Sequence, residues 1–523
     1  MTAIRLISSA ATVGAWTFLS RILGFARDIL IAAWLGSGPV AEAFLVAFSL
    51  PNMFRRFFAE GAFNMAFVPM FAKKLELGED AGGFARDALS GLTLILIIIA
   101  VLGTVFMPWL VLAMASGFAN DMRLDSAVTL GRIVFVYIVF ISLAALLSGV
   151  LNAGGKFAAA AAAPVLLNVF LIGVLILAEL GFGNSVIGEA ESARHGTLLA
   201  YGVVLAGIAQ LALVWLAARA AGFDLRPGWP RWTPDLKRLA VIAMPAMLAG
   251  GVVQNNLLIG RQVASYFDGA IVWLSFADRL YQLPLGVVGI AIGIVLLPDL
   301  SRRLAADDTD GGQFAFSRAV ELSLALAIPA AAALAVIPAA IVRTLFEHGA
   351  FGPADTAATA LATAIYGLGL PAFVLQKALQ PLYFARQDTR RPFRFAAAAM
   401  LINATLAIGL APFIGYIAAA IGTTIAAWFM LALLHLGSRK MGPAAQLDAQ
   451  ARKRLPRTLL ATAVMAVGLW FLDRLLAPVA AIGEPAAIAS LALLCVLGLL
   501  IYGVAGTAIG AFSVSELRNA MRR

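Results

Sequence analysis

The chain has 523 residues, of which 62% are apolar and only 13% are charged. A soluble domain averages roughly 45–50% apolar and about 25% charged residues, so this composition excludes an ordinary water-soluble fold and indicates a protein that folds in lipid. The net charge of +10 does not indicate nucleic-acid binding, because the basic residues lie in short loops between apolar segments, where positive charge sets membrane orientation.

Apolar segments long enough to cross a bilayer follow one another along the chain. A hydrocarbon core of about 30 Å requires roughly 20 apolar residues in a helix. We therefore predict an all-α polytopic membrane protein with fourteen transmembrane helices, near residues 8–35, 41–71, 89–115, 125–152, 159–180, 197–220, 238–266, 270–300, 314–345, 356–385, 393–412, 414–437, 457–477 and 484–510. The first segment lacks the short apolar core and small-residue cleavage site of a signal peptide, so we interpret it as a retained helix.

The basic residues of the loops fall mainly on one side of the membrane. One set of loops and ends holds 26 of the 38 lysines and arginines, whereas the other set holds only Arg123, Arg132, Arg194, Arg343 and Arg474. Cytoplasmic loops are enriched in positive charge. This asymmetry predicts a multi-pass inner-membrane protein with both termini in the cytoplasm.

A faint internal repeat divides the chain. Leu50-Pro51 recurs as Leu283-Pro284 at an offset of 233 residues, and the LNAGGKF segment at Leu151 corresponds to LYFARQD at Leu382, at an offset of 231. Two parallel halves predict six-helix lobes related by a pseudo-two-fold axis along the membrane normal. We expect lobes at 1–222 and 223–440, followed by two extra helices within 441–523.

Several basic residues lie inside or at the edges of the predicted spans. They are Arg21 and Arg27 in SRILGFARD, Arg55 and Arg56 in LPNMFRRFFAEGAFNMAFVP, Arg261, Arg279 in FADRL, and Lys377. An arginine at the bilayer centre costs about 2.5–3.5 kcal/mol on insertion scales, so several of them should face a wet cavity between helices. Guanidinium groups fork hydrogen bonds onto phosphate, and several around one cavity suit a diphosphate on a large anionic lipid.

Two other interpretations of these arginines stay open. They could form ion pairs that hold the bundle together, between helices or, for Arg56 and Glu60 four residues apart, along one helix. They could also reach the membrane interface, an option for Arg27 and Arg261. Lys377 could equally line a cavity or support packing.

Helical geometry separates some of these groups. Arg21 and Asp28 are seven residues apart and share a face, with Gly24 between them as a possible bend, whereas Arg27 points roughly 120° away from Arg21. Asp278 and Arg279 diverge by about 100°, so an ideal helix would not pair them directly.

The segments SRILGFARD, LPNMFRRFFAEGAFNMAFVP and FADRLYQLPLGVVGIAIGIVLLPDLS resemble the MurJ (MviN) family of lipid II flippases in the MOP transporter superfamily. The resemblance covers essentially all fourteen spans. It implies a central cavity and a groove for a polyprenyl tail formed by the last two helices. It also implies a transporter and not an enzyme, acting in peptidoglycan biosynthesis, cell wall biogenesis and cell shape.

The resemblance further implies the substrate and its ligands. The substrate would be lipid II, an undecaprenyl-diphosphate-linked disaccharide-pentapeptide, moved from the cytoplasmic to the periplasmic leaflet by alternating access. The chain would work among membrane lipids as a monomer, without a nucleic-acid partner. The implied substrate-binding residues are Arg21, Arg27, Arg55, Arg56 and Arg279, with Ser20, Asp28, Glu42, Glu60 and Asp278 supporting the cavity. Glu42 stands where other members often have Asp.

Other kinds of site find little support. Cys495 is the only cysteine, the three histidines are scattered, and no Walker A motif is present, so we expect no metal, cofactor or ATP hydrolysis. Some family members place a sodium site in spans seven and eleven, but these spans hold Asn255, Asn256 and Asn403 and no Asp or Glu.

Three alternative functions remain. A flippase for another polyprenyl-diphosphate-linked glycan would use the same phosphate site. A multidrug cation exporter of the same superfamily would favour an acidic cavity, and an enzyme acting on lipid-linked sugars would need a catalytic cluster that the sequence does not show.

Overall fold

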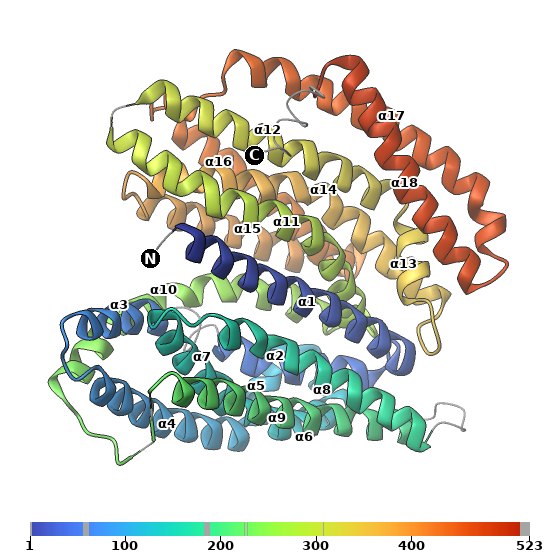
Figure 1. Ribbon diagram of the computed structural model, residues 1–523. Coiled ribbons are helices and arrows are strands. Elements are labelled where there is room, and N and C mark those ends of the chain that lie inside the picture. The colour runs from blue at the N-terminus through green and yellow to red at the C-terminus, as the bar shows by residue number, and fades with distance from the viewer. Residues whose placement is uncertain are drawn as a thin grey trace. The chain divides into compact units, whose positions relative to one another are not determined.

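The computed structural model describes residues 3–55, 62–182, 189–223, 225–226, 228–306 and 308–512. Every regular element in these ranges is a helix (Figure 1). The all-α class expected from composition is therefore confirmed.

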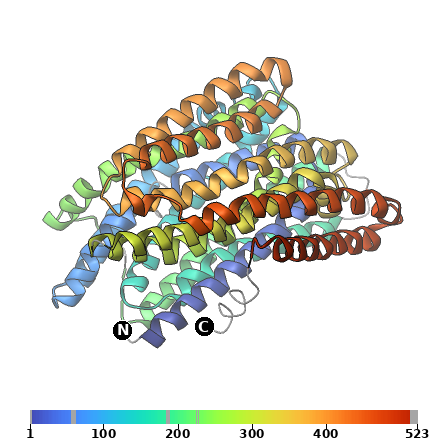
Figure 2. The same ribbon diagram turned by 90° about the horizontal axis from the view of Figure 1, so that it is seen from above.

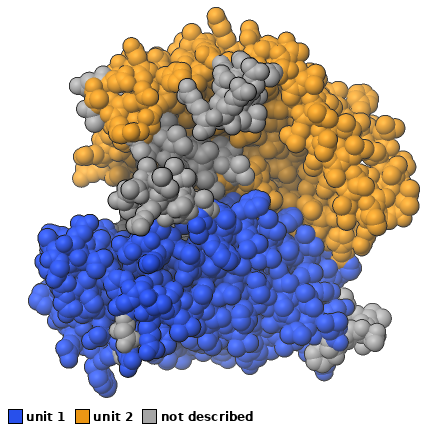
Figure 3. All heavy atoms as spheres, viewed as in Figure 1, with its two compact units in different colours: residues 1–272, 349–351 blue, residues 273–348, 352–523 orange. Residues whose placement is uncertain are grey.

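The chain divides into two compact units, which Figure 3 shows in different colours. Unit 1 comprises residues 1–272 and 349–351, and unit 2 comprises residues 273–348 and 352–523. The lobes expected at 1–222 and 223–440 rest on a sequence repeat, which this division by compactness does not test, so they stay a prediction.

Unit 1 contains ten α-helices and one short 3-10 helix among its described residues. They are α1 (Ala3–Leu35), α2 (Pro39–Arg55), α3 (Ala62–Glu76), α4 (Ala81–Val105), α5 (Met107–Met114), η2 (Ser116–Phe118), α6 (Met122–Val134), α7 (Tyr137–Ala153), α8 (Ala158–Phe182), α9 (Glu189–Ala220) and α10 (Pro234–Ala264).

Unit 2 holds most of α11 and all the helices after it. These are α11 (Ala270–Ala305), α12 (Thr309–Val336), α13 (Pro338–Phe346), α14 (Pro353–Phe384), α15 (Arg390–Ile414), α16 (Ile417–Ser438), η3 (Pro443–Ala445), α17 (Ala449–Ala480) and α18 (Glu484–Ile509). The last two helices lie side by side in both Figure 1 and Figure 2.

Helices lie in each of the expected spans, within the residues that the structure describes. Within the described residues, ten segments are long and apolar enough to cross a membrane, from Ala81–Val105 to Glu484–Ile509. The remaining expected spans correspond to α1, to α2 with α3, to α10 and to α11. The chain is thus a multi-pass membrane protein, while the count of fourteen crossings stays a prediction.

Besides the span at 41–71, which is not described throughout, three expected spans consist of two helices each instead of one. The span at 89–115 breaks at Phe106 and the span at 314–345 breaks at Ile337, each just before a helix with proline in its first turn. Proline has no backbone N–H and is tolerated at a helix start, where that donor would be unpaired. The two breaks are 231 residues apart, the offset of the sequence repeat. The span at 125–152 turns at Phe135 and Val136.

Side-chain caps fix several helix starts that position the sites described below. The carboxylates of Asp80 and Asp121 accept from backbone N–H groups at the starts of α4 and α6, and Thr233 does the same for α10. Such caps satisfy donors that have no partner within the helix. Within unit 1, α8 packs against both α1 and α9, which brings the middle of α1 into a polar contact with α8.

Candidate functional site

Arg27 on α1 is buried by partners on its own helix and on α8. Its side chain donates from Nε to Asp28 Oδ1 at 3.1 Å and from Nη2 to the same oxygen at 2.6 Å. Its Nη1 donates to Asn168 Oδ1 at 3.1 Å. Arg27 and Asp28 are only 7% and 5% exposed. The guanidinium therefore lies inside unit 1 and not at a membrane surface.

Asn168 links this arginine to a position two turns earlier on α1. Its Nδ2 donates to the backbone oxygen of Ser20 at 2.9 Å and lies 3.4 Å from Ser20 Oγ. Gly24 lies between these positions, and a Cβ added there would lie 3.5 Å from Asn168 Nδ2. Helix α1 continues without a break through Gly24. The structure thus brings together Ser20, Arg27 and Asp28, and adds Asn168.

For the other predicted binding residues of the first two spans, the structure describes the side chain of Arg21 only. Arg21 on α1 is exposed. Arg55 is the last residue of α2, and its side chain lies outside the described part of the chain. Arg56 and Glu60 also lie outside the described residues, so their predicted pairing stays a prediction.

The predicted residues of span eight lie in unit 2. Asp278 and Arg279 are half-buried on α11, and Asp278 accepts a hydrogen bond from Gln282 Nε2. The buried ring of Tyr281 follows on the same helix and packs against Tyr366 of α14 with 5.3 Å between ring centroids. This part of α11 therefore carries Asp278 and Arg279 one turn or less before the packed ring of Tyr281.

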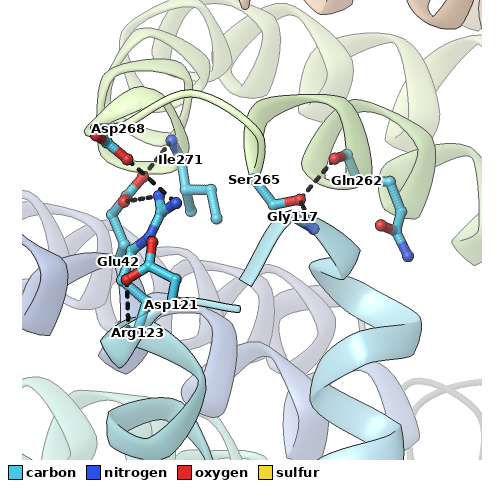
Figure 4. A network of polar contacts seen from close by, with 8 residues as sticks. All are labelled: Glu42, Gly117, Asp121, Arg123, Gln262, Ser265, Asp268 and Ile271. Carbon is cyan, nitrogen blue, oxygen red and sulfur yellow. Dashed lines mark hydrogen bonds and ion pairs between the residues drawn. The ribbon is translucent and has the colours of Figure 1, made fainter. Parts of the chain in front are cut away.

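Glu42 takes part in a different network, shown in Figure 4. Its carboxylate, in a residue only 1% exposed, accepts from Arg123 Nη1 at 2.8 Å and from the backbone N–H of Ile271 at 3.1 Å. Ile271 lies in the first turn of α11, where backbone N–H groups lack helical partners and the helix dipole favours a negative charge. Glu42 thus joins α2 to α6 and to the start of α11.

Arg123 is the centre of that network. It donates to Glu42, to Asp121 through Nε, and to Asp268 through Nη2 at 3.1 Å. Its guanidinium carbon also lies 4.6 Å from the centroid of the Phe118 ring. One buried cation is therefore surrounded by three carboxylates.

A neighbouring set of hydrogen bonds joins the end of α10 to the chain between α5 and α6. Gln262 Oε1 accepts from the backbone N–H and hydroxyl of Ser116 at 2.8 and 2.6 Å, and Ser265 Oγ accepts from the Gly117 N–H at 2.9 Å. A Cβ on Gly117 would lie 2.4 Å from the carbonyl carbon of Ser265. The close approach requires glycine at position 117.

Sequence reasoning missed two of these residues. Asn168 is an amide within an apolar span, which is a detectable signal because a buried polar group needs a partner. The sequence alone indicates only a loop charge at Arg123, because two of its three carboxylate partners, Glu42 and Asp268, come from distant parts of the sequence. For the residues of the possible sodium site, Asn403 is fully buried next to Gly422, whereas the side chains of Asn255 and Asn256 are outside the described residues.

Comparison with known proteins identifies the family. The family described as "Lipid II flippase MurJ" matches residues 31–488. A protein of Rhizobium meliloti named "Probable lipid II flippase MurJ" is 43% identical over 99% of this chain and 96% of its own length. The "Lipid II flippase MurJ" of Burkholderia cenocepacia is 36% identical over 84% of this chain and 85% of its own length.

Solved structures agree on the fold. A lipid II flippase MurJ in an inward closed conformation superposes with a TM-score of 0.77 at 24% identity, covering 95% of this chain and 98% of the other. An inward-facing multidrug resistance MATE transporter of the MOP superfamily gives 0.65 at 15% identity, covering 83% of this chain and 98% of the other. Given the match along most of its sequence, the chain belongs to the MurJ family of lipid II flippases.

Proposed function

We propose that this protein moves lipid II from the cytoplasmic to the periplasmic leaflet of the bacterial inner membrane by alternating access. The observation that carries the proposal is 43% identity across 99% of the chain with a relative named as a probable lipid II flippase. The chain would act as a transporter and not as an enzyme, as a monomer among membrane lipids, with both termini in the cytoplasm.

The diphosphate of the lipid would be held by Arg21, Arg27, Arg55, Arg56 and Arg279. Arg27 supports this role because Asp28 and a neutral amide hold its guanidinium in a fixed orientation. Ser20, Asp28, Glu60 and Asp278 would support the cavity around these arginines.

Glu42 and Arg123 would hold α2, α6 and the start of α11 together on the periplasmic side. Three carboxylates around one arginine, joined to a helix N-terminus, tie these segments together within unit 1. In this proposal Glu42 supports the transport cycle without touching the lipid.

The last two helices would bind the undecaprenyl tail. Along α17 and α18, Met465, Leu469, Leu494 and Tyr502 form a buried cluster with Ile337. Large apolar side chains on the same two helices are exposed, among them Leu459, Val467, Phe471, Leu499 and Val504. Such a surface suits lipid chains and not water.

The proposal is tested by transport of fluorescent lipid II in proteoliposomes. Arg21→Ala, Arg55→Ala and Arg279→Ala are each expected to lower the rate strongly, while full activity in all three would contradict the anion site. Depletion in the native bacterium should cause cytoplasm-facing lipid II to accumulate. Unchanged peptidoglycan precursors would favour a flippase for another polyprenyl-diphosphate-linked glycan.

A further inference from the structure

The connection between α9 and α10 is fastened to three other helices. We call residues 225–226 and 228–238, which comprise the second part of this connection and the first residues of α10, the tryptophan loop. The backbone oxygen of Leu225 accepts from Trp215 Nε1 of α9 at 3.0 Å, and the N–H of Gly228 donates to Ser90 Oγ of α4 at 2.9 Å. Farther along, Asp235 pairs with Lys74 of α3 at 3.0 Å. The loop therefore has a defined path over unit 1.

Two tryptophan side chains of this loop are exposed. Trp229 is 91% exposed and Trp232 is 72% exposed. Arg231, Lys237 and Arg238 beside them are exposed as well. Asp235, whose partner Lys74 also pairs with Glu79, is the one acidic residue in the stretch 225–238, against four basic residues, so the stretch carries a net positive charge. Exposed tryptophans next to a net positive charge are typical of a membrane interface.

We propose that the tryptophan loop docks onto the anionic phospholipid headgroups of the cytoplasmic leaflet. The two indoles lie at the level of the headgroups, and the three cations face lipid phosphates. Charge complementarity selects this partner, because the cytoplasmic leaflet attracts clusters of Lys and Arg near the membrane surface. A neutral bilayer would satisfy the indoles but not the cations.

A fluorescent label at the loop tests this proposal. Cys495 is the only cysteine, so Cys495→Ser with Trp229→Cys gives a single attachment point for an environment-sensitive fluorophore. In nanodiscs with one third phosphatidylglycerol, emission should shift to the blue relative to pure phosphatidylcholine. Adding Arg231→Gln, Lys237→Gln and Arg238→Gln should remove the difference between the two lipids.

A matched label at exposed Asn120, in the connection between η2 and α6, should show no dependence on lipid charge. Equal emission from the Trp229 label in neutral and anionic nanodiscs would overturn the proposal. That result would favour a protein partner over lipid headgroups as the occupant of the loop.

A second observation concerns Asn168 and stands apart from the loop. This amide is 6% exposed and contacts α1 at two points, Ser20 and Arg27. Those residues are seven apart, which places them two turns apart on one face of α1. One side chain of α8 therefore fastens two turns of the helix that carries Arg27.

The two partners of Arg27 hold different edges of its guanidinium. Asp28 accepts hydrogen bonds from Nε and Nη2, while the side-chain oxygen of Asn168 accepts one from Nη1. We infer that Asn168 is a positioning residue that sets the orientation of Arg27 for the diphosphate, an inference that rests on the proposed function. A neutral amide does this without adding a second negative charge, which would compete with phosphate for the arginine.

The test compares Asn168→Ala with Gln210→Ala. Gln210 is a matched control because it is a buried amide of α9 that also bonds to α8, through the backbone oxygen of Ala163 at 2.8 Å. Asn168→Ala should raise the half-saturating concentration of lipid II about tenfold, the scale of one hydrogen bond to a charged group, with little change in maximal rate. Gln210→Ala should change neither quantity.

The results distinguish failure of this inference from failure of the proposed function on which it rests. Loss of transport in Arg27→Ala with normal kinetics in Asn168→Ala would overturn only the positioning role, as would equal effects of Asn168→Ala and Gln210→Ala. Normal transport in Arg27→Ala would instead contradict the arginine site itself.

Discussion

The two arginines that are buried among the described residues of unit 1 differ in what surrounds them. Arg27 has one carboxylate and one amide as partners, whereas Arg123 has three carboxylates. A guanidinium has five N–H donors, so Arg27 keeps capacity for another acceptor. Arg123 sits among an excess of negative charge and has little to offer an anionic ligand. Burial alone therefore does not mark a binding arginine, while the charge balance of its partners does.

The largest expected effect on transport distinguishes a binding arginine from a simple charge. Arg27→Lys keeps the positive charge beside Asp28, but an ammonium cannot present the planar fork that pairs with phosphate. We expect transport of lipid II to fall at least about tenfold while the protein still folds, since a tenfold change corresponds to about 1.4 kcal/mol. Proteoliposome transport and size-exclusion profiles measure the two properties. A rate equal to wild type would make Arg27 a structural ion pair.

The next prediction concerns Arg123. Arg123→Ala leaves the buried carboxylate of Glu42 without its cation, and breaking a buried ion pair costs about 3–5 kcal/mol. The free energy of unfolding in detergent should decrease by that amount. Asp268→Asn removes only the exposed partner and serves as the control, with a change below about 1 kcal/mol. If Arg123→Ala keeps full stability, the network is not a structural contact.

Two glycines sharpen the comparison because they lie beside the two arginine clusters. Gly117→Ala forces a Cβ to 2.4 Å from the backbone of Ser265, so overpacking should reduce stability by about 1–3 kcal/mol. Gly24→Ala meets Asn168 only at ordinary contact distance and should be neutral, or stabilise α1 by up to about 1 kcal/mol. Thermal unfolding of the two variants measures the contrast. A reversed order would contradict the packing described at both sites.

The smallest expected effect is that of Glu42→Asp. The shorter side chain keeps the charge but cannot reach both Arg123 and the Ile271 N–H, so one hydrogen bond weakens. The loss should be about 1 kcal/mol, the usual net contribution of a single hydrogen bond. Denaturant titration measures it, and Glu42→Gln should be clearly worse. Equal losses in both variants would show that reach and not charge matters at this position.

Local signals in the sequence were enough to predict the helices and the family. Long apolar segments and the charge of the loops predict the spans. Pro108 and Pro338 lie at helix breaks that the predicted spans do not include, although proline is a detectable signal for a helix start. The turn at Phe135 had no such signal. It depends on packing, because the Phe135 ring occupies the space that a Cβ on Gly103 would need.

Side-chain partners were harder to predict than helices. Side chains of consecutive residues in an ideal helix point about 100° apart. The long side chain of Arg27 nevertheless reaches the carboxylate of Asp28, the next residue. The partners of Arg123 come from α2, from its own loop and from the turn before α11. Only the tertiary fold brings those segments together, so no spacing in the sequence could reveal them.

The length of α17 has a mechanical consequence. Its 32 residues span about 48 Å, whereas the hydrocarbon core is about 30 Å thick. Its first turns carry Arg452, Lys453 and Arg457, which belong at the headgroup level and keep that end from sinking into the core. A helix that is too long and is held at one end responds to bilayer thickness by tilting. Because α17 packs against both α12 and α18, these contacts set how far it tilts, and its basic first turns extend beyond the hydrocarbon core.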